Sequence, residues 1–422
     1  MGTAQAESKL GNIVPVSHYR KAQTLNYPKL PKEILSRIAG GKTRKSATST
    51  VDASLSKDWA LANIDFFKVF TPLVQPIVSE TVSCSNAVIV AVIDTGMDYT
   101  HPELKDSLWV NKGESGAWEP PASLKQLGFT CRDKSCNGID DDGNGFIDDV
   151  VGWDFVHDVP LPYDTHGHGT HIAGIIAGAS ANGIGTSGVC PRVTIMPLKY
   201  YDNSGVGYNN LTNTVRAIRY AVRAGAHIIN YSGGGSDPAP SEKAAILEAQ
   251  QKGVLFVAAA GNDGRSNDRI PYYPASYQLD NIVGVASVNR DNILLPSSNY
   301  GKSVHLAAPG LMILSALPAG KFGTMSGTSQ ATAFATGAAA LLASQMDGQD
   351  PREHYGKIKS WLYRGAKPMK NNEKKVMVSG GLLSVSLALK EQRKDLKPKA
   401  VASRPEIALR PGGLIKKIRT TK

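Results

Sequence analysis

Three polar side chains of the kinds used in nucleophilic catalysis stand beside small or apolar segments of this chain. Ser329 lies in Gly327–Leu342, where glycine, threonine and alanine surround it before an Ala-rich apolar run. This pattern predicts a buried helix with Ser329 at its N-terminus. First-turn N–H groups lack intrahelical partners and the helix dipole is positive there, so such an end can stabilise an oxyanion. By itself, a serine in this place is also an ordinary helix N-cap.

The other two side chains, Asp94 and His168, each border a buried segment. Residues 87–93 form a β-branched apolar run that predicts a buried parallel strand, and Asp94 follows it. Ligands bind beyond the carboxyl ends of such strands, although a turn aspartate is equally expected there. His168 opens a second helix of small residues. The nearby His166 and His171 raise the alternative of zinc, but no His-Glu-x-x-His pattern or flanking cysteine pair accompanies them.

A separate acidic segment, Asp140–Asp149, fits the first nine positions of a calcium-binding loop. The loop would use side-chain oxygens, a turn glycine and one backbone carbonyl, supplied by Asp140, Asp142, Asn144, Gly145, Phe146 and Asp148. Position twelve is Val151 instead of glutamate, so we expect Asp149 or another group to complete the shell. Five aspartates in ten residues repel one another unless a cation is present. This favours calcium over a solvated acidic turn.

Strands and helices alternate around these residues. Strands are predicted at 193–198, 226–230 and 254–260, and helices at 209–224 and 242–251. Such alternation predicts an α/β fold: a doubly wound, mostly parallel sheet flanked by helices in a single large domain. No Gly-x-Gly-x-x-Gly follows the first strand and no Gly-x-x-x-x-Gly-Lys-Ser/Thr occurs, so a nucleotide site is not expected.

Composition and charge set further bounds. The 422 residues are 41% hydrophobic, as expected for a globular protein. The net charge of +11 belongs to the ends, because residues 1–50 and 391–422 carry +7 each and the middle carries −3. We expect a basic leader at 1–55, one domain at 56–390 and a basic tail at 391–422. Neither end interleaves aromatic residues with its charges, so nucleic acid is not an expected partner. No run is apolar enough to span a membrane, and any export signal is expected to precede residue 1.

The four cysteines allow three pairings. Cys131 and Cys136 border a short polar loop, where a local disulfide is favoured over zinc because two thiolates alone cannot complete a tetrahedral shell. Cys84 and Cys190 either pair with each other or stay free. Oxidised cysteines would indicate a secreted or extracellular protein, which also suits a calcium site.

Four blocks of the sequence resemble the signature blocks of the subtilisin-like serine proteases, the subtilase family. They are Val-Ile-Asp-Thr-Gly at 92–96, His-Gly-Thr-His-Ile-Ala-Gly at 168–174, Ala-Ala-Gly-Asn at 259–262 and Gly-Thr-Ser at 327–329. Their chain order, Asp94, His168 and then Ser329, is that of the family. The resemblance covers about residues 56–390. It implies a subtilisin-like catalytic domain and a serine endopeptidase that acts on protein or peptide substrates.

The resemblance also implies roles for single residues. Ser329 would be the nucleophile, His168 the general base and Asp94 the group that orients the imidazole. The Asn262 amide would bind the oxyanion together with the Ser329 backbone N–H. The substrate backbone would meet Ser232, Gly233 and Gly234, with Tyr208 on the opposite rim.

The chain departs from the family pattern in places. Gln330 and Ala333 stand where methionine and proline are usual, and neither change removes a catalytic group. The leader is shorter than a usual inhibitory pro-domain, yet we expect its cleavage between about Lys42 and Lys57. Tyr272–Pro274 lie near the primary specificity pocket of the family. Because Asp263 and Asp268 are also near, both apolar and basic substrate side chains stay open.

Calcium is the expected cofactor, with a second, weaker site that the resemblance alone suggests at Glu103 and Asn182. The enzyme is expected to be a monomer. Two other functions stay open: a noncatalytic peptide-binding relative, and a protein that holds an anionic surface with its basic ends.

Overall fold

A ten-stranded sheet forms the centre of the computed structural model, which describes residues 25, 27–38, 52–70, 82–126, 130–202, 210–346, 348–369 and 377–396. Across these residues the strand order is β11-β12-β8-β7-β6-β5-β1-β4-β2-β3. Neighbouring strands are parallel except in the outermost pair at each edge. The strands are β1 (Ile89–Asp94), β2 (Trp153–Asp154), β3 (Val159–Pro160), β4 (Thr194–Lys199), β5 (Ile228–Tyr231), β6 (Leu255–Ala259), β7 (Ile282–Val288), β8 (Leu306–Pro309), β11 (Lys367–Pro368) and β12 (Gly381–Leu382).

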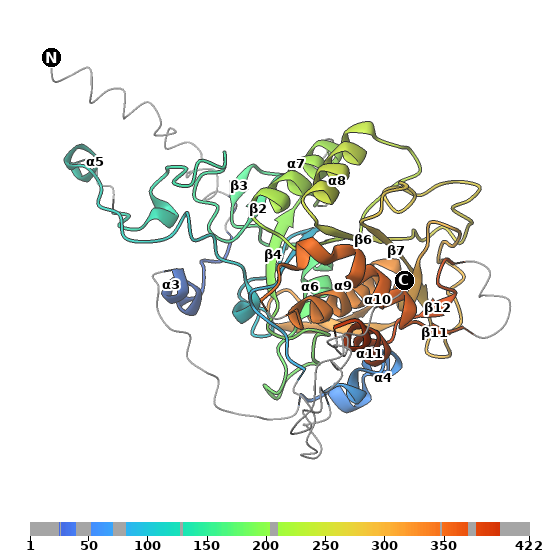
Figure 1. Ribbon diagram of the computed structural model, residues 1–422. Coiled ribbons are helices and arrows are strands. Elements are labelled where there is room, and N and C mark those ends of the chain that lie inside the picture. Colours follow the sequence, from blue (N-terminus) through green and yellow to red (C-terminus); the bar gives the residue numbers. More distant parts are fainter. Residues whose placement is uncertain are drawn as a thin grey trace, which may run out of the picture.

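Helices cover both faces of this sheet (Figure 1). α7 and α8 pack on one face, and α6 and α9 pack on the other, where α10 and α11 form an outer layer against α9. The helices are α3 (Lys32–Ile38), α4 (Trp59–Asn63), α5 (Ala122–Gln126), α6 (His168–Ala177), α7 (Asn210–Arg223), α8 (Pro240–Gln251), α9 (Thr328–Ser344), α10 (Tyr355–Arg364) and α11 (Val385–Leu396). Short 3₁₀ helices span Leu55–Lys57, Phe66–Lys68, Lys105–Ser107, Lys134–Cys136 and Pro351–His354.

The central strand β1 divides its side chains between the two cores. Val90 and Val92 join the core on the α6 and α9 side, whereas Ala91 and Ile93 join the core on the α7 and α8 side. Because successive side chains of a strand point to opposite faces and both faces are covered, the segment is one unbroken apolar run. The predicted α/β fold with a doubly wound, mostly parallel sheet is confirmed.

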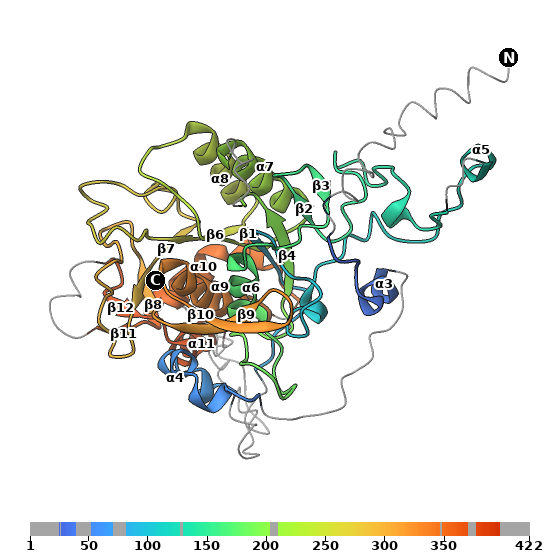
Figure 2. The same ribbon diagram turned by 180° about the vertical axis from the view of Figure 1, so that it is seen from behind.

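A second, two-stranded antiparallel sheet lies beside α6 (Figure 2). It consists of β9 (Ile313–Leu317) and β10 (Lys321–Met325) and precedes α9 in the chain. His171 on α6 is fully buried, and its Nε2 lies 2.9 Å from the Ile313 carbonyl oxygen and 3.2 Å from that of Gly323. These contacts tie the helix that begins at His168 to the hairpin that leads into the Ser329 helix.

Part of the predicted leader packs against the domain. Ile34 on α3 is fully buried, and Arg37 donates a 2.7 Å hydrogen bond to the Leu108 carbonyl. The Tyr27 hydroxyl donates to the Asp154 carboxylate at 3.0 Å, next to the buried Lys199. Contacts with the domain therefore begin well before residue 56, where we expect the domain itself to start.

Two disulfides join the four cysteines. The predicted local bridge Cys131–Cys136 is present, and Cys84 pairs with Cys190, which resolves the alternative of free thiols. The second bridge closes a separation of 106 residues between the start of β1 and the segment before β4. Among the described residues, no helix is both long and apolar enough to cross a membrane.

Candidate active site

Asp94 and His168 meet where β1 ends and α6 begins. The His168 Nδ1 atom lies 2.7 Å from Asp94 Oδ1, and the same oxygen accepts the Thr95 backbone N–H at 2.8 Å. The Asp94 side chain is 4% exposed and the imidazole 24%. Burial alone would lower the pKa of His168, but the charge and hydrogen bond of Asp94 outweigh it and raise this pKa above its usual value. The pair is therefore a carboxylate-held imidazole that faces solvent on one side.

Glycine is required where α6 approaches β1. A Cβ atom on Gly169 would lie 2.1 Å from the Gly96 carbonyl oxygen and 3.2 Å from the Asp94 Cβ. No other side chain fits this contact without moving the backbone. The glycine after His168 thus sets the distance between the imidazole and the carboxylate.

Asp164 positions the segment that carries His168, a part that sequence reasoning missed. This carboxylate is fully buried and accepts five hydrogen bonds. The donors are the Thr95 hydroxyl, the backbone N–H groups of His166, Gly167 and Thr170, and the Thr170 hydroxyl. The only sequence signal for this role is an aspartate four residues before the histidine.

Ser329 lies in the first turn of α9, as predicted, and is 8% exposed. Its hydroxyl donates to the Ser232 carbonyl at 3.3 Å, and no hydrogen bond joins it to His168 within the described part of the chain. A hydroxyl can turn about its χ1 torsion without a change in the backbone. Ser329 thus lies at the N-terminus of α9, and its side chain must rotate for the hydroxyl to reach His168.

The Asn262 side chain is fixed beside Ser329 by Thr328. Its Oδ1 accepts the Thr328 backbone N–H at 2.9 Å and the Thr328 hydroxyl at 3.1 Å. Both bonds use the carbonyl end of the amide, so its Nδ2 hydrogens remain available. The side chain is exposed. An amide donor thus stands next to the N-terminus of α9, and Thr328 is a second positioning residue that sequence reasoning did not identify.

A cavity of about 220 Å³ opens beside His168. Its lining consists of Asp94, Thr95, His166, His168, Tyr200, Tyr201 and Ser232. Ser232 in this lining directly follows β5, and Gly233 and Gly234 continue the chain from it. Tyr208, predicted on the opposite rim, lies outside the described residues.

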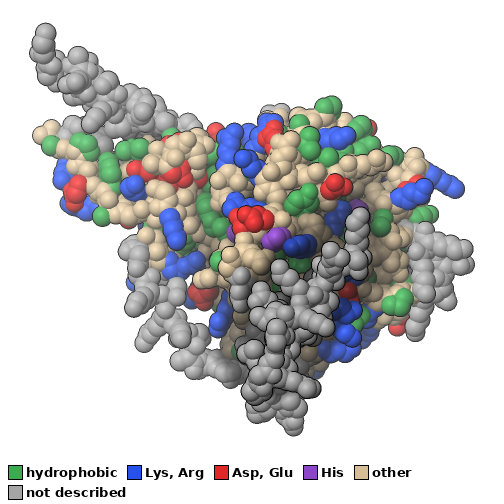
Figure 3. Space-filling view, in the orientation of Figure 1, with side chains coloured by type: hydrophobic (Ala, Val, Ile, Leu, Met, Phe, Trp, Pro, Cys, Tyr) green, Lys and Arg blue, Asp and Glu red, His purple; other side chains and the backbone are tan. Residues whose placement is uncertain are grey.

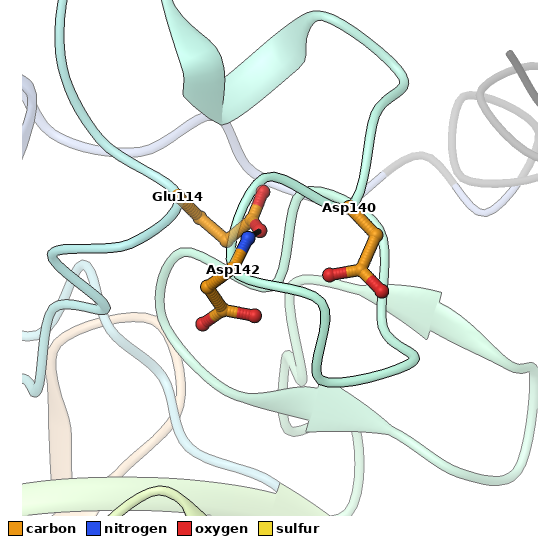
Figure 4. A group of neighbouring side chains, drawn as sticks. All are labelled: Glu114, Asp140 and Asp142. Atoms are coloured by element: carbon orange, nitrogen blue, oxygen red, sulfur yellow. Dashed lines mark hydrogen bonds between the residues drawn. The ribbon is translucent and has the colours of Figure 1, made fainter. Parts of the chain in front are cut away.

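The acidic loop gathers three carboxylates, one of which comes from outside it. Oxygen atoms of Glu114, Asp140 and Asp142 lie within 4.8 Å of one another (Figure 4). Glu114 is fully buried; its Oε1 accepts the N–H groups of Asp141 and Asp142, while its Oε2 has no hydrogen-bond partner. Burial and the negative charges of Asp149 and Asp142 raise the pKa of Glu114 to about 8. Glu114 stands 26 residues before Asp140 in the chain, so no local pattern pointed to it.

The other predicted ligands lie around this group in different ways. The Asn144 backbone N–H donates to both Asp140 and Asp142 at 3.1 Å. Asp149 accepts hydrogen bonds from Tyr220, Asn111 and Asn144, and Asp148 accepts the Gly138 N–H, so neither carboxylate joins the three. The Phe146 ring packs edge-on against Trp153 and Tyr220. The loop is thus pinned to the core from both sides of the acidic group.

The weaker predicted site also contains a buried carboxylate. Glu103 is 2% exposed, its Oε1 accepts the Asn182 side-chain N–H at 3.2 Å, and its Oε2 has no partner. Asp52 accepts the N–H groups of residues 181–183 at 2.8 to 3.2 Å. Burial, and to a smaller degree the charge of Asp52, raise the pKa of Glu103 to about 8.

Comparison with known proteins gives the family of this chain. The subtilase family model matches residues 85–386. The thermophilic serine proteinase of Bacillus sp. strain AK1 is 35% identical over 256 residues, which are 61% of this chain and 52% of that protein. Thermitase of Thermoactinomyces vulgaris is 41% identical over 46% of this chain and 68% of its own. The major intracellular serine protease of Bacillus subtilis is 36% identical over 60% and 68%.

A solved structure agrees with these relatives. A cold-adapted subtilisin-like serine proteinase is similar with a TM-score of 0.55 and 25% identity, over 78% of this chain and 97% of that one. The chain belongs to the subtilase family. It spans about half the length of the strain AK1 proteinase.

Proposed function

We propose that this chain hydrolyses peptide bonds with Ser329 as nucleophile, His168 as general base and Asp94 as the group that orients the imidazole. The observation that carries the proposal is the 2.7 Å contact between His168 Nδ1 and Asp94 Oδ1. This contact directs the Nδ1 proton to the carboxylate, so Nε2 keeps a lone pair for the serine proton. The same contact stabilises the imidazolium that forms during the reaction.

The reaction then follows from the positions of these groups. Ser329 Oγ turns from the Ser232 carbonyl to His168, attacks the substrate carbonyl carbon and gives its proton to Nε2. The tetrahedral intermediate collapses as His168 passes this proton to the leaving amine, which leaves an acyl-enzyme ester. Water, deprotonated by the same imidazole, hydrolyses the ester and returns the proton to Ser329.

The oxyanion of both tetrahedral intermediates needs donors that already point at it. The Asn262 amide supports this role because Thr328 holds its carbonyl end at 2.9 and 3.1 Å and leaves the Nδ2 hydrogens available. The Ser329 backbone N–H, in the first turn of α9, is the second donor. The helix dipole adds positive potential at the same place.

Protein or peptide substrates would approach as an extended strand. Ser232, Gly233 and Gly234 continue β5 past the sheet and present backbone groups beside the site. Their lack of bulky side chains permits another chain to come close, as in strand addition. Tyr208 is expected on the opposite rim.

A fluorophosphonate that reacts with activated serines tests the proposal. Intact wild-type protein should lose peptidase activity as one equivalent is bound, and mapping should place the label on Ser329. The matched control is Ser329→Ala, which should remain unlabelled. A wild-type protein that hydrolyses no peptide and takes up no label would instead be a noncatalytic peptide-binding protein, and the proposal would be wrong.

We further propose that calcium binds at the acidic loop and stabilises the domain. The donor set fits, because Glu114 Oε2 is buried without a partner and carboxylates of Asp140 and Asp142 lie within 4.8 Å of Glu114. Asn144, the Phe146 carbonyl, Asp148 and Asp149 remain the other predicted oxygen donors. Calcium accepts six to eight oxygens in flexible geometry and would supply charge neutralisation, with no part in peptide hydrolysis. A second site is proposed at Glu103, Asn182 and Asp52, where another buried carboxylate oxygen has no partner.

The remaining expectations concern processing and location. Two disulfides support a secreted, extracellular enzyme, which also suits the proposed calcium site, although one matching relative is named as intracellular. We propose that residues 1–55 act as a pro-segment, cleaved between about Lys42 and Lys57, while the basic tail stays without an assigned role. On the face in Figure 3, Lys and Arg of the described residues are scattered, with Asp and Glu among them. Nucleic acid is not an expected partner. A monomer is the expected state.

A further inference from the structure

The ring of Tyr272 lies between two glycines, Gly234, two residues after Ser232, and Gly261, directly before Asn262. A Cβ atom on Gly234 would fall 2.6 Å from Tyr272 Cε1, and one on Gly261 would fall 2.9 Å from Tyr272 Cγ and Cδ2. Both glycines have positive φ angles, +153° and +105°. The ring therefore touches both backbones at once, and it fits only because neither glycine carries a side chain.

These two glycines flank the place where a substrate side chain must go. Gly234 belongs to the segment expected to pair with the substrate backbone, and Gly261 directly precedes Asn262. In an extended substrate, successive side chains point to opposite sides. The cavity of about 220 Å³ beside His168, which Tyr272 does not line, can take the side chain of P2, the second residue before the cleaved bond. The side chain of P1, the residue whose carbonyl is attacked, then points the other way, into the gap that Tyr272 occupies.

The backbone around Tyr272 is anchored to the segment that it faces. The Tyr272 N–H donates to the Ser276 hydroxyl at 3.1 Å, and Tyr273 exchanges two backbone hydrogen bonds with Gly235, at 2.7 and 3.0 Å. To move the ring away by a backbone shift would break these bonds. The backbone that carries Tyr272 is thus fixed in the wall.

Three acidic side chains lie near Tyr272, and none offers a free carboxylate to a basic substrate residue. Glu242 is buried and hydrogen-bonded with Tyr277. Asp263 pairs with Arg265 at 3.2 Å and is about half exposed. Asp268 accepts the Lys302 backbone N–H at 2.8 Å and lies against Gly301. Charge therefore gives no reason to expect lysine or arginine at P1.

We propose that Tyr272 fills the P1 pocket and restricts cleavage to bonds that follow glycine, alanine or serine. This inference rests on the proposed peptidase function. A P1 leucine or phenylalanine would overlap the ring, and a packed wall does not yield to extra methylenes without strain. The protein then selects substrates that have a small residue at P1, whereas the cavity beside His168 can hold a larger side chain at P2.

A set of peptide anilides that differ only in P1 tests this inference. The wild-type protein should cleave the alanine peptide with a kcat/KM at least about 50-fold above that of the phenylalanine peptide, since mismatched volume in a pocket is worth tens to hundreds of fold. Tyr272→Gly should raise the ratio of kcat/KM for the phenylalanine peptide to that for the alanine peptide at least about tenfold. Tyr272→Phe, which keeps the ring, is the matched control and should retain the wild-type preference.

Labelling distinguishes a failure of the proposed peptidase function from a failure of the proposed role of Tyr272. A small fluorophosphonate has no P1 side chain, so equal labelling of Ser329 in wild type and variants shows that folding and chemistry are intact; if Tyr272→Gly labels poorly, Tyr272→Ala replaces it. A wild-type protein that cannot be labelled contradicts the peptidase function itself. A labelled wild type that prefers phenylalanine, or a Tyr272→Gly variant with an unchanged alanine-to-phenylalanine ratio, overturns only the role of Tyr272.

Discussion

The Asp94–His168 edge and the acidic loop both concentrate buried carboxylates, but they differ in how these charges are satisfied. At the edge, Asp164 accepts five hydrogen bonds and Asp94 accepts bonds from Thr95 and His168. In the loop, the fully buried Glu114 keeps one oxygen without a partner. An unpartnered buried carboxylate is costly, whereas a fully bonded one holds its surroundings in place. At the edge, the protein itself supplies hydrogen-bond partners for the buried carboxylates, whereas in the loop one buried carboxylate oxygen lacks a partner.

This difference separates chemistry from stability. Groups at the edge are already oriented, so changes there should reduce reaction rates and leave the unfolding temperature almost unchanged. The loop is the proposed calcium site, so changes there should reduce stability first and rate second. Each of the following experiments can contradict this division.

The largest effect is expected for Ser329→Ala. Loss of the nucleophile should lower kcat for peptide hydrolysis at least about 10⁴-fold, because the remaining groups cannot form an acyl-enzyme. The unfolding temperature and its response to calcium should match those of the wild type. Steady-state kinetics and thermal melts with and without chelator measure both quantities. A large change in melting would show that the edge also carries stability.

The next effect concerns the oxyanion donor. Asn262→Ala should lower kcat about 10²- to 10³-fold with little change in KM, which is the size of the loss established for the corresponding amide of subtilisin itself. Thr328→Val is the matched control: it removes one hydroxyl bond to Asn262 but keeps the 2.9 Å backbone bond, so its loss should stay below about tenfold. Equal losses in the two variants would indicate that Asn262 acts through packing near Ser329.

The contrast also bears on what the sequence can predict. The edge was predictable because each of its residues ends or begins an element: Asp94 ends β1, and His168 and Ser329 lie in the first turns of α6 and α9. The apolar runs end or begin next to these residues, so periodicity points to them. The family membership confirmed by comparison follows from the same blocks.

What could not be predicted comes from residues distant in sequence. Glu114 reaches the acidic loop through a tertiary contact, and nothing in the local pattern marks it. Tyr272 fills the space between Gly234 and Gly261 only because three separate loops converge there. The pairing of Cys84 with Cys190 depends on β1 and β4 being neighbours. Periodicity describes one helix or strand at a time and carries no information about such tertiary contacts.

Calcium removal should affect stability by an intermediate amount. An ion that binds only the native state adds about 2.7 kcal/mol at a hundredfold excess over Kd, so chelation should lower the unfolding temperature before activity declines. Asp142→Ala should copy the chelated state at saturating calcium, and magnesium should restore little because it demands stricter octahedral geometry. Differential scanning calorimetry measures these shifts.

The matched control for this site is Asp141→Asn. The Asp141 carboxylate bonds to Asn137 and lies 3.6 Å from Lys134, away from the three clustered acids, so this variant should keep the full calcium shift. No shift in the wild type would refute the calcium site. An equal shift in the wild type and in Asp142→Ala would move the site to Glu103 and Asn182, where Glu103→Gln becomes the decisive variant.

The smallest expected effect is a shift in the pH dependence of the rate. Burial lowers the pKa of His168. The charge of Asp94 and the hydrogen bond that it accepts raise this pKa by more, with a smaller contribution from Asp164, so the net shift is upward. The base must be neutral to accept the serine proton, so kcat/KM should rise with pH through a midpoint above 6.5 and be lost as pH falls through it. Asp94→Asn should move the midpoint down, because the charge that raises the pKa is gone and the burial remains.

Burial lowers the pKa of His171 to about 4 and of His305 to about 3, so both stay neutral over this range and provide internal references. NMR titration of the imidazole protons on a Ser329→Ala background, which prevents self-cleavage, measures the His168 midpoint directly. An unchanged midpoint in Asp94→Asn would mean that the carboxylate holds the ring in place without setting its charge.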